Sequence, residues 1–177
     1  MFTIVILSFH SQHLVEKTVK SLDRKIPIII IENSQNSNLK KKLETEYQNV
    51  KIIIPTENLG FSKGMNLGIK ESKTEYVFLN PADVLLPNNC INSLIDCLKT
   101  FNDFAMLAPT YKDETIYKNY EIFSKKEKVN GDSARKYGIK EVDFIDGTFI
   151  VKKSQFEKIG LMDENIFIYF ETMDLCK

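Results

Sequence analysis

The stretch TIVILSFHSQHLVEKTVKSLDRKIPIIII, residues 3–31, decides the fold class. It begins and ends with short, continuous apolar runs, at 3–9 and 26–31, of the β-branched kind found in strands that are buried on both faces. Between these runs, apolar residues recur at helical spacing, at Leu14, Val15, Val19 and Leu22. Ser11 precedes this pattern as the predicted N-cap. The stretch therefore predicts a strand, a helix and a second strand.

The same alternation continues along the chain. Apolar runs at 50–55 and 75–80 predict two more buried strands, and the segments 38–48 and 88–100 predict helices. Buried strands that alternate with helices form βαβ units around a parallel sheet. We therefore predict an α/β fold with a mostly parallel sheet covered by helices, in a single domain.

The second half of the chain is less regular. A short strand is predicted at 104–109, and residues 142–160 predict a strand, a turn at Gly147, a second strand and a helix. Between them, the segment 112–140 has little periodicity and carries more basic than acidic residues. We interpret it as a basic excursion between the sheet and the final unit.

Composition excludes several classes of protein. With 24 basic and 24 acidic residues among 177, the chain has no global charge that would attract nucleic acid. Its apolar fraction of 43% is too high for a disordered chain, and no apolar stretch is long enough to span a bilayer. The three cysteines lack metal-site or disulfide spacing, which predicts free thiols in a reducing, cytoplasmic setting.

Ligands of parallel sheets bind at the carboxyl ends of the strands, and polar residues follow four of the predicted strands. These residues lie at 9–11, 32–34, 56–58 and 80–83. In the last group, Asp83 comes directly after a buried strand, where a carboxylate suits a divalent cation that takes its other ligands from water and substrate phosphate. The alternative is an Asp that accepts a local hydrogen bond in a Pro-containing turn.

The segment ENLGFSKGMNLGIKES, residues 57–72, carries glycines at four-residue intervals. On a helix, Gly64 and Gly68 share a face that allows a strand or a ligand to approach closely. Packing of the helix on the sheet explains this spacing as well as ligand binding does. The segment contains neither a dinucleotide fingerprint nor a Walker A loop.

Four acidic residues gather near the C-terminal end of the sequence, among aromatic residues. They are Asp163, Glu164, Glu171 and Asp174. A carboxylate held among aromatic side chains can have a raised pKa and act as a general base. A solvated acidic face of an amphipathic helix is the alternative.

Taken together, these segments resemble the inverting family 2 glycosyltransferases of the GT-A fold, in particular their rhamnosyltransferase-like branch. The resemblance is carried by LSFHS (7–11), IIEN (30–33), NLGFSKGMNLG (58–68), LNPAD (79–83) and GLMDENIFIYFETMDL (160–175). It implies a GT-A type, Rossmann-like sheet. It also divides the chain into a nucleotide-binding half (1–110), a basic variable excursion (111–140) and an incomplete acceptor-side half (141–177).

The resemblance implies a nucleotide-diphosphate sugar donor, of UDP or dTDP type, lying across the strand ends. The residues it assigns to nucleotide-sugar binding are Phe9, Glu32, Asn58, Gly60, Lys63, Asn66, Asn80 and Gly147. Asp83 would hold Mg²⁺ or Mn²⁺ against the diphosphate. Glu171 and Asp174 are the implied catalytic carboxylates, one of which would deprotonate the acceptor hydroxyl.

Several positions depart from the family pattern. Glu32 stands where the family has Asp. Ala82 separates Pro81 from Asp83, so either the metal loop has a one-residue insertion or the metal position is displaced, and the distance to Pro87 favours Asp83. Thr172 occupies the position of the Asp that is usually assigned as the base, and Thr alone is no base at neutral pH. The chain is also shorter than the family pattern, which usually continues with further helices over the acceptor site.

The implied function is sugar transfer with inversion to a glycan or lipid-linked acceptor, as in the biosynthesis of cell-surface polysaccharide. The alternative is a non-catalytic, nucleotide-sugar-binding remnant that has lost its base at Thr172 and its C-terminal cover. A sugar nucleotidyltransferase is disfavoured, because the chain lacks the Gly-rich, basic N-terminal loop used on triphosphates. The basic excursion is a candidate for peripheral contact with the inner face of the membrane, or a solvated loop.

Overall fold

The computed structural model describes residues 2–101, 104–111, 119–123 and 138–176. Its strands are β1 (Phe2–Ser8), β2 (Ile28–Glu32), β3 (Val50–Ile53), β4 (Tyr76–Pro81), β5 (Met106–Leu107), β6 (Tyr120–Glu121), β7 (Phe144–Ile145) and β8 (Phe149–Lys152). Its helices are α1 (Gln12–Ser21), α2 (Ser37–Glu46), α3 (Gly60–Glu71), α4 (Asn88–Thr100), α6 (Lys153–Ile159) and α7 (Glu171–Leu175).

Six of the strands form one sheet in the order β3-β2-β1-β4-β8-β5. The first four in this order run parallel to one another, whereas β8 runs antiparallel to both of its neighbours, β4 and β5. The prediction of an α/β fold with a mostly parallel sheet is therefore confirmed. The strand boundaries shift by one or two residues from those predicted, and β1 ends at Ser8, which leaves Phe9 outside the strand.

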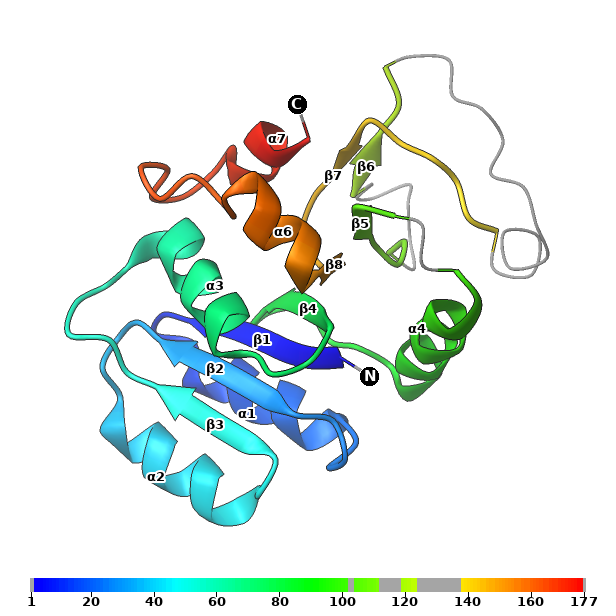
Figure 1. Ribbon diagram of the computed structural model, residues 1–177. Helices are drawn as coiled ribbons and strands as arrows, with labels where there is room; N and C mark the ends of the chain where they lie inside the picture. Colours follow the sequence, from blue (N-terminus) through cyan, green and yellow to red (C-terminus); the bar gives the residue numbers. More distant parts are fainter. Residues whose placement is uncertain (1, 102–103, 112–118, 124–137, 177) are drawn as a thin grey trace.

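Helices cover both faces of this sheet (Figure 1). In β1, Ile4 and Ile6 belong to a core that also includes residues of α1, α2 and α4, whereas Val5 belongs to a second core with residues of α3 and α6. This alternation follows from the strand geometry, in which successive side chains point to opposite faces. Burial on both faces explains why the parallel strands are continuous apolar runs rather than alternating ones.

The helix α3 lies against β1 at unusually short range because of its glycines. A Cβ atom added to Gly68 would lie 2.2 Å from Val5 Cγ1, and one added to Gly64 would lie 2.5 Å from Leu7 Cδ1. Real Cβ contacts do not occur at such distances. Of the two explanations for the glycine spacing, the structure confirms helix-to-sheet packing for these two residues.

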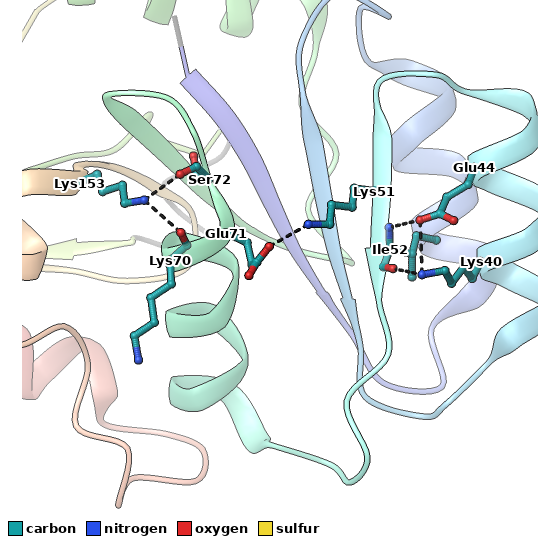
Figure 2. A network of polar contacts seen from close by, with 8 residues as sticks. All are labelled: Lys40, Glu44, Lys51, Ile52, Lys70, Glu71, Ser72 and Lys153. Carbon is teal, nitrogen blue, oxygen red and sulfur yellow. Dashed lines mark hydrogen bonds and ion pairs between the residues drawn. The ribbon is translucent and has the colours of Figure 1, made fainter.

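The free edge of the sheet at β3 is covered by polar side chains (Figure 2). The Ile52 backbone N–H donates to Glu44 Oε1 at 2.7 Å, and Lys40 Nζ donates to the Ile52 carbonyl at 2.6 Å. Lys51 pairs with Glu71 at 2.7 Å between the edge strand and the end of α3. Because an uncovered edge strand can pair with another chain, these contacts protect the sheet from edge-to-edge association.

One local prediction needs correction. Ser11 stands at the N-cap position of α1, but its hydroxyl donates to the Phe9 carbonyl at 2.8 Å instead of capping the helix.

The predicted order of strand, turn at Gly147, strand and helix in residues 142–160 is confirmed by β7, β8 and α6. The two strands belong to different sheets, because β7 pairs with β6 in a separate two-stranded sheet while β8 joins the main sheet.

The basic excursion lies mostly outside the described residues, which include only 111, 119–123 and 138–140 of the predicted segment 111–140. The structure therefore gives no account of its predicted contact with a membrane. Among the helices in the described ranges, none has both the length and the apolar character needed to cross a bilayer.

We predict that Gly68→Ala destabilises the protein although alanine favours helices by about 1 kcal/mol over glycine. The added Cβ collides with Val5, and overpacking of this kind costs about 1–3 kcal/mol. Urea denaturation of Gly68→Ala, Val5→Ala and the double variant measures the effect. The double variant should lose less stability than the sum of the two single losses, because Val5→Ala removes the colliding methyl groups. A Gly68→Ala variant as stable as the wild type would contradict the close contact.

Candidate functional site

The carboxyl ends of β1, β2 and β4 lie side by side at one edge of the sheet. Leu7 of β1 is opposite Ile31 of β2 on one side and Pro81 of β4 on the other, and Ser8 is opposite Glu32. The loops that follow these strands therefore begin at nearly the same level. This arrangement brings the predicted polar residues at 9–11, 32–34 and 80–83 to a common edge.

Glu32, Asn33, Asn58 and Gly60 form a corner between the end of β2 and the start of α3, here called the β2–α3 corner. Glu32 is buried, and its Oε1 accepts hydrogen bonds from the backbone N–H of Ser34, at 2.9 Å, and from the Ser34 hydroxyl. The side-chain amide of Asn33 donates to the Gly60 carbonyl at 3.1 Å, and the Gly60 N–H donates to Asn58 Oδ1 at 3.0 Å. Side chains thus fix the shape of this corner.

A chain segment 96 residues away in sequence closes the other side of α3. The Asn66 amide group donates to the Met162 carbonyl at 2.9 Å and accepts from the Met162 N–H at 3.1 Å. The Phe61 N–H donates to the Phe167 carbonyl at 2.6 Å, and a Cβ at Gly60, whose φ is +69°, would lie 2.5 Å from that carbonyl oxygen. The glycine at position 60 therefore allows the C-terminal segment to cross the first turn of α3.

Buried polar side chains fix the turn that carries Asp83 through hydrogen bonds. Asn80, at the end of β4, is buried, and its amide donates to the carbonyls of Pro81 and Val84 at 2.9 Å each. The Thr148 hydroxyl lies 2.9 Å from Asn80 Oδ1, so the same side chain also holds the start of β8. Asp83 itself is exposed at the top of this turn. Its position is thus fixed by neighbours while its carboxylate faces solvent.

Tyr111 lies between the Asp83 turn and the turn at Gly147. Burial raises the pKa of its hydroxyl, and the charges of Asp146 and Asp83 raise it further, which places both carboxylates near this ring. A Cβ added to Gly147, whose φ is +78°, would lie 2.3 Å from the Tyr111 hydroxyl. Glycine at this position therefore serves both the turn conformation and the close approach of the tyrosine.

Asp146 and Glu171, here called the carboxylate pair, lie where the turn between β7 and β8 meets the start of α7. Asp146 Oδ1 accepts hydrogen bonds from the Gly147 N–H at 2.7 Å and from the Thr172 hydroxyl at 3.3 Å. Glu171 is only 8% exposed, and its Oε2 has no hydrogen-bond partner among the described residues. Burial, together with the charge of Asp146, raises the pKa of the Glu171 carboxyl against the opposing effect of a backbone hydrogen bond.

The carboxylates at this edge fit a metal that takes few protein ligands. Within the described ranges, no three His, Cys, Asp or Glu side chains come together in a way that could hold an ion by themselves. Mg²⁺ keeps several waters and is bound through one or two carboxylates plus substrate phosphates. The exposed carboxylate of Asp83 meets that requirement, whereas the buried Glu171 does not.

The structure separates the predicted site residues into four groups. Glu32, Asn58 and Gly60 meet in the β2–α3 corner, whereas Asn80, Asp83, Gly147 and Glu171 surround the Asp83 and Gly147 turns. Asn66 is buried against the C-terminal segment. Phe9, Lys63 and Asp174 are exposed. Their individual contacts with a nucleotide sugar stay predictions.

Four residues that shape this edge were given no individual role from the sequence: Tyr111, Asp146, Thr148, and Asn33, which lies in the predicted polar group 32–34. The Asp146-Gly147 pair is a turn signal that could have drawn attention to that carboxylate. Tyr111 gave no local signal, because its importance comes from the turn packed against it.

Comparison with known proteins identifies related chains. The model of the family described as Glycosyl transferase family 2 matches residues 3–160. A dTDP-rhamnosyl transferase of Shigella flexneri is 27% identical over 157 residues, which cover 84% of this chain and 52% of that protein. A low-salt glycan biosynthesis hexosyltransferase of Haloferax volcanii is 22% identical over 187 residues, covering 98% of this chain and 60% of that protein. The chain thus spans little more than half the length of either relative.

Solved structures show the same fold. The structure of GalNAc-T7 with UDP, GalNAc and Mn²⁺ superimposes with a TM-score of 0.73. The two chains are 18% identical, and the match covers 99% of this chain and 40% of that one. At this level of identity the likeness concerns the fold, which is the GT-A fold expected from the sequence.

We predict that Glu171→Gln stabilises the protein near neutral pH. Because the pKa of Glu171 is raised in the folded state, the native protein binds its proton more tightly than the unfolded chain does. Folding stability therefore falls as pH rises from the ordinary carboxyl range through the folded pKa. The variant should have a higher Tm than the wild type near neutral pH, and the difference should vanish below a pH of about 4.

Glu164→Gln is the matched control with the opposite sign. The hydrogen bond from Asn66, reinforced by Lys70, holds the pKa of the Glu164 carboxyl below its ordinary value despite partial burial. This stabilisation is present above the unfolded pKa and is lost as pH falls through the folded pKa. The control should therefore lower Tm near neutral pH and converge with the wild type in acid. Equal Tm shifts of the same sign in both variants would contradict the assigned surroundings.

Proposed function

The chain belongs to glycosyl transferase family 2, and from this membership we propose that it binds a nucleotide-diphosphate sugar at the carboxyl ends of β1, β2 and β4 and transfers the sugar to an acceptor. The observation that carries the proposal is the arrangement at this edge. The charges of Asp83, an exposed carboxylate, and of Asp146, a member of the carboxylate pair, both raise the pKa of the Tyr111 hydroxyl, and the charge of Asp146 also raises that of Glu171. One carboxylate can bind a metal, while the others can accept the proton of the acceptor hydroxyl.

The donor nucleotide is proposed to lie over the β2–α3 corner. Support comes from the firm geometry of this corner, which the Asn33 side chain maintains, and from the exposed side chains of Phe9, Asn58 and Lys63 around it. Lys63 adds a positive charge near the first turn of α3, which suits a diphosphate. UDP and dTDP are the proposed nucleotides, as the sequence predicts. UDP is bound in the similar structure of GalNAc-T7, and dTDP is part of the name of the similar rhamnosyl transferase.

Asp83 is proposed to hold Mg²⁺ or Mn²⁺. A bound divalent cation would neutralise the charge that develops on the leaving diphosphate. The chain's contribution is to fix the turn under this carboxylate, which Asn80 does through two backbone carbonyls. The ion's other ligands would be water and phosphate oxygens. The neighbouring structure with Mn²⁺ supports this choice of ion.

On the acceptor side, we propose that the carboxylate pair receives the proton of the attacking hydroxyl. Glu171 and Asp174 are the catalytic residues predicted from the sequence. Glu171 belongs to the carboxylate pair, since the charge of Asp146 contributes to its raised pKa, whereas Asp174 is exposed. Attack on the anomeric carbon from the side opposite the diphosphate would invert its configuration.

The proposed positions of donor and acceptor divide the chain into two functional parts. We propose that residues 1–110 form the nucleotide-binding half and 141–177 part of the acceptor-side half. The acceptor is proposed to be a glycan or a lipid-linked sugar of a cell-surface polysaccharide. The names of the two relatives, a rhamnosyl transferase and a glycan biosynthesis hexosyltransferase, support this class of acceptor.

Nucleotide binding and sugar release test the proposed function. UDP or dTDP with Mn²⁺ should raise Tm, because a ligand that binds only the native state stabilises it. UDP-glucose, UDP-N-acetylglucosamine and dTDP-rhamnose should be hydrolysed or transferred in the presence of Mn²⁺ and not with chelator. Absence of any nucleotide-induced Tm shift would refute the proposal. Binding without turnover would instead identify the non-catalytic alternative.

We predict that Asp83→Asn abolishes the Mn²⁺-dependent part of the Tm shift and lowers donor turnover at least tenfold, because the amide removes the anionic metal ligand. Glu46→Gln is the matched control, since Glu46 is an exposed carboxylate at the end of α2 on the far side of the sheet. The control should keep both the Tm shift and the turnover. A full Mn²⁺ response in Asp83→Asn would show that the metal binds elsewhere.

A further inference from the structure

The proposed function leaves open which oxygen takes the proton from the acceptor. A general base must come within hydrogen-bond reach of the proton that it removes. Glu171 does not meet this condition well, because its Oε2 is fully buried and the residue is only 8% exposed. Its raised pKa also means that it holds a proton more readily than an ordinary carboxyl does. The other carboxylate of the pair is therefore the one to consider.

Asp146 differs from Glu171 in its access and in its support. It is half-buried, in the turn between β7 and β8, and its backbone N–H donates to the Asn119 carbonyl at 2.9 Å. Its Oδ1 is fixed by the Gly147 N–H at 2.7 Å and by the Thr172 hydroxyl at 3.3 Å. The carboxylate is therefore held in one orientation by two elements, the turn and α7.

The surroundings of Asp146 bring polar groups from several parts of the chain to one carboxylate. They include the Gly147 N–H of its own turn, the Thr172 hydroxyl of α7 and the carboxyl of Glu171. The charge of Asp146 also contributes to the raised pKa of the Tyr111 hydroxyl. Geometry thus places Asp146 among the groups that the proposed reaction would use.

Resting on the proposed function, we propose that Asp146 is the general base of the transfer reaction and that Thr172 is the residue that positions it. In this step the acceptor O–H gives its proton to the Asp146 carboxylate, and the acceptor oxygen forms a bond to the anomeric carbon of the donor. The bond from that carbon to the phosphate oxygen breaks, and the nucleoside diphosphate leaves with the electron pair. With water as acceptor, the same step hydrolyses the donor.

The short distance between the two side chains provides a direct test. Thr172 Oγ1 and Asp146 Oδ1 are 3.3 Å apart, so the carboxylate can be moved across this hydrogen bond from the turn to α7 with little displacement. The variants are Asp146→Asn, Asp146→Ser and the double variant Asp146→Ser with Thr172→Asp. Each is assayed in the full chain with Mn²⁺ for hydrolysis of UDP-glucose, UDP-N-acetylglucosamine and dTDP-rhamnose, and for the Tm shift caused by UDP or dTDP.

The expected result is a loss of kcat of about 10²–10⁴-fold in Asp146→Asn and Asp146→Ser, with the nucleotide-induced Tm shift unchanged. The double variant should recover at least tenfold of the kcat lost by Asp146→Ser, because it restores a carboxylate at the same place. Thr172→Val, which removes only the positioning hydroxyl, should lower kcat less than Asp146→Asn and leave KM for the donor unchanged.

Retention of the wild-type kcat in Asp146→Asn would overturn the assignment, as would a double variant no more active than Asp146→Ser. A wild type that binds nucleotide but turns over none of the donors would also overturn it, while leaving nucleotide binding intact. A wild type with no nucleotide-induced Tm shift would instead refute the proposed function itself. The two failures are therefore distinguished by the Tm shift of the unmodified chain.

Discussion

The approach of α3 to β1 is the contact on which the candidate site depends. A side chain larger than hydrogen at Gly68 or Gly64 would overlap Val5 or Leu7, so the position of the helix on the sheet depends on glycine at both places. This position places the first turn of α3 beside the end of β2, where Asn33 reaches the Gly60 carbonyl. It also presents the same turn to Phe167, which lets the C-terminal segment pack across it.

Three buried asparagines connect the strands and α3 to the loops around the candidate site through hydrogen bonds. Asn33 joins β2 to the start of α3, Asn66 joins α3 to residue 162, and Asn80 joins β4 to the Asp83 turn and to Thr148. An amide can donate and accept at once, so one side chain satisfies backbone groups of two segments. Loss of one such buried partner costs about 1–3 kcal/mol, because the backbone group that remains is unpaired. Two of these residues, which the sequence assigned to ligand binding, act in the structure as supports for the loops around the site.

The sequence predicted the parts of the fold that depend on local pattern. The apolar runs at 3–9 and 26–31 became β1 and β2 because burial on both faces requires continuous apolar side chains. Asp83 was found because it follows such a run. The sequence could not show that β7 and β8 belong to different sheets. The same pattern of apolar residues fits two strands of one sheet and two strands of separate sheets. Nor could it show the contact of Asp146 with Thr172, which joins residues 26 positions apart through tertiary packing alone.

The surroundings of Glu171 indicate that the proposed acceptor side of the site has a function beyond folding. Glu171 Oε2 is buried and has no hydrogen-bond partner within the part of the chain that the structure describes, and its raised pKa destabilises the folded protein near neutral pH. An amide or apolar residue would fit the same space at lower cost. Folding alone gives no reason to keep it there. Perturbed carboxyls gather at functional sites because catalysis needs such surroundings. Beside it, Asp146 is held by a backbone N–H and a hydroxyl in a defined orientation. The two members of the pair thus differ in their surroundings, as the proposed division of roles requires, in which Asp146 exchanges the proton and Glu171 does not.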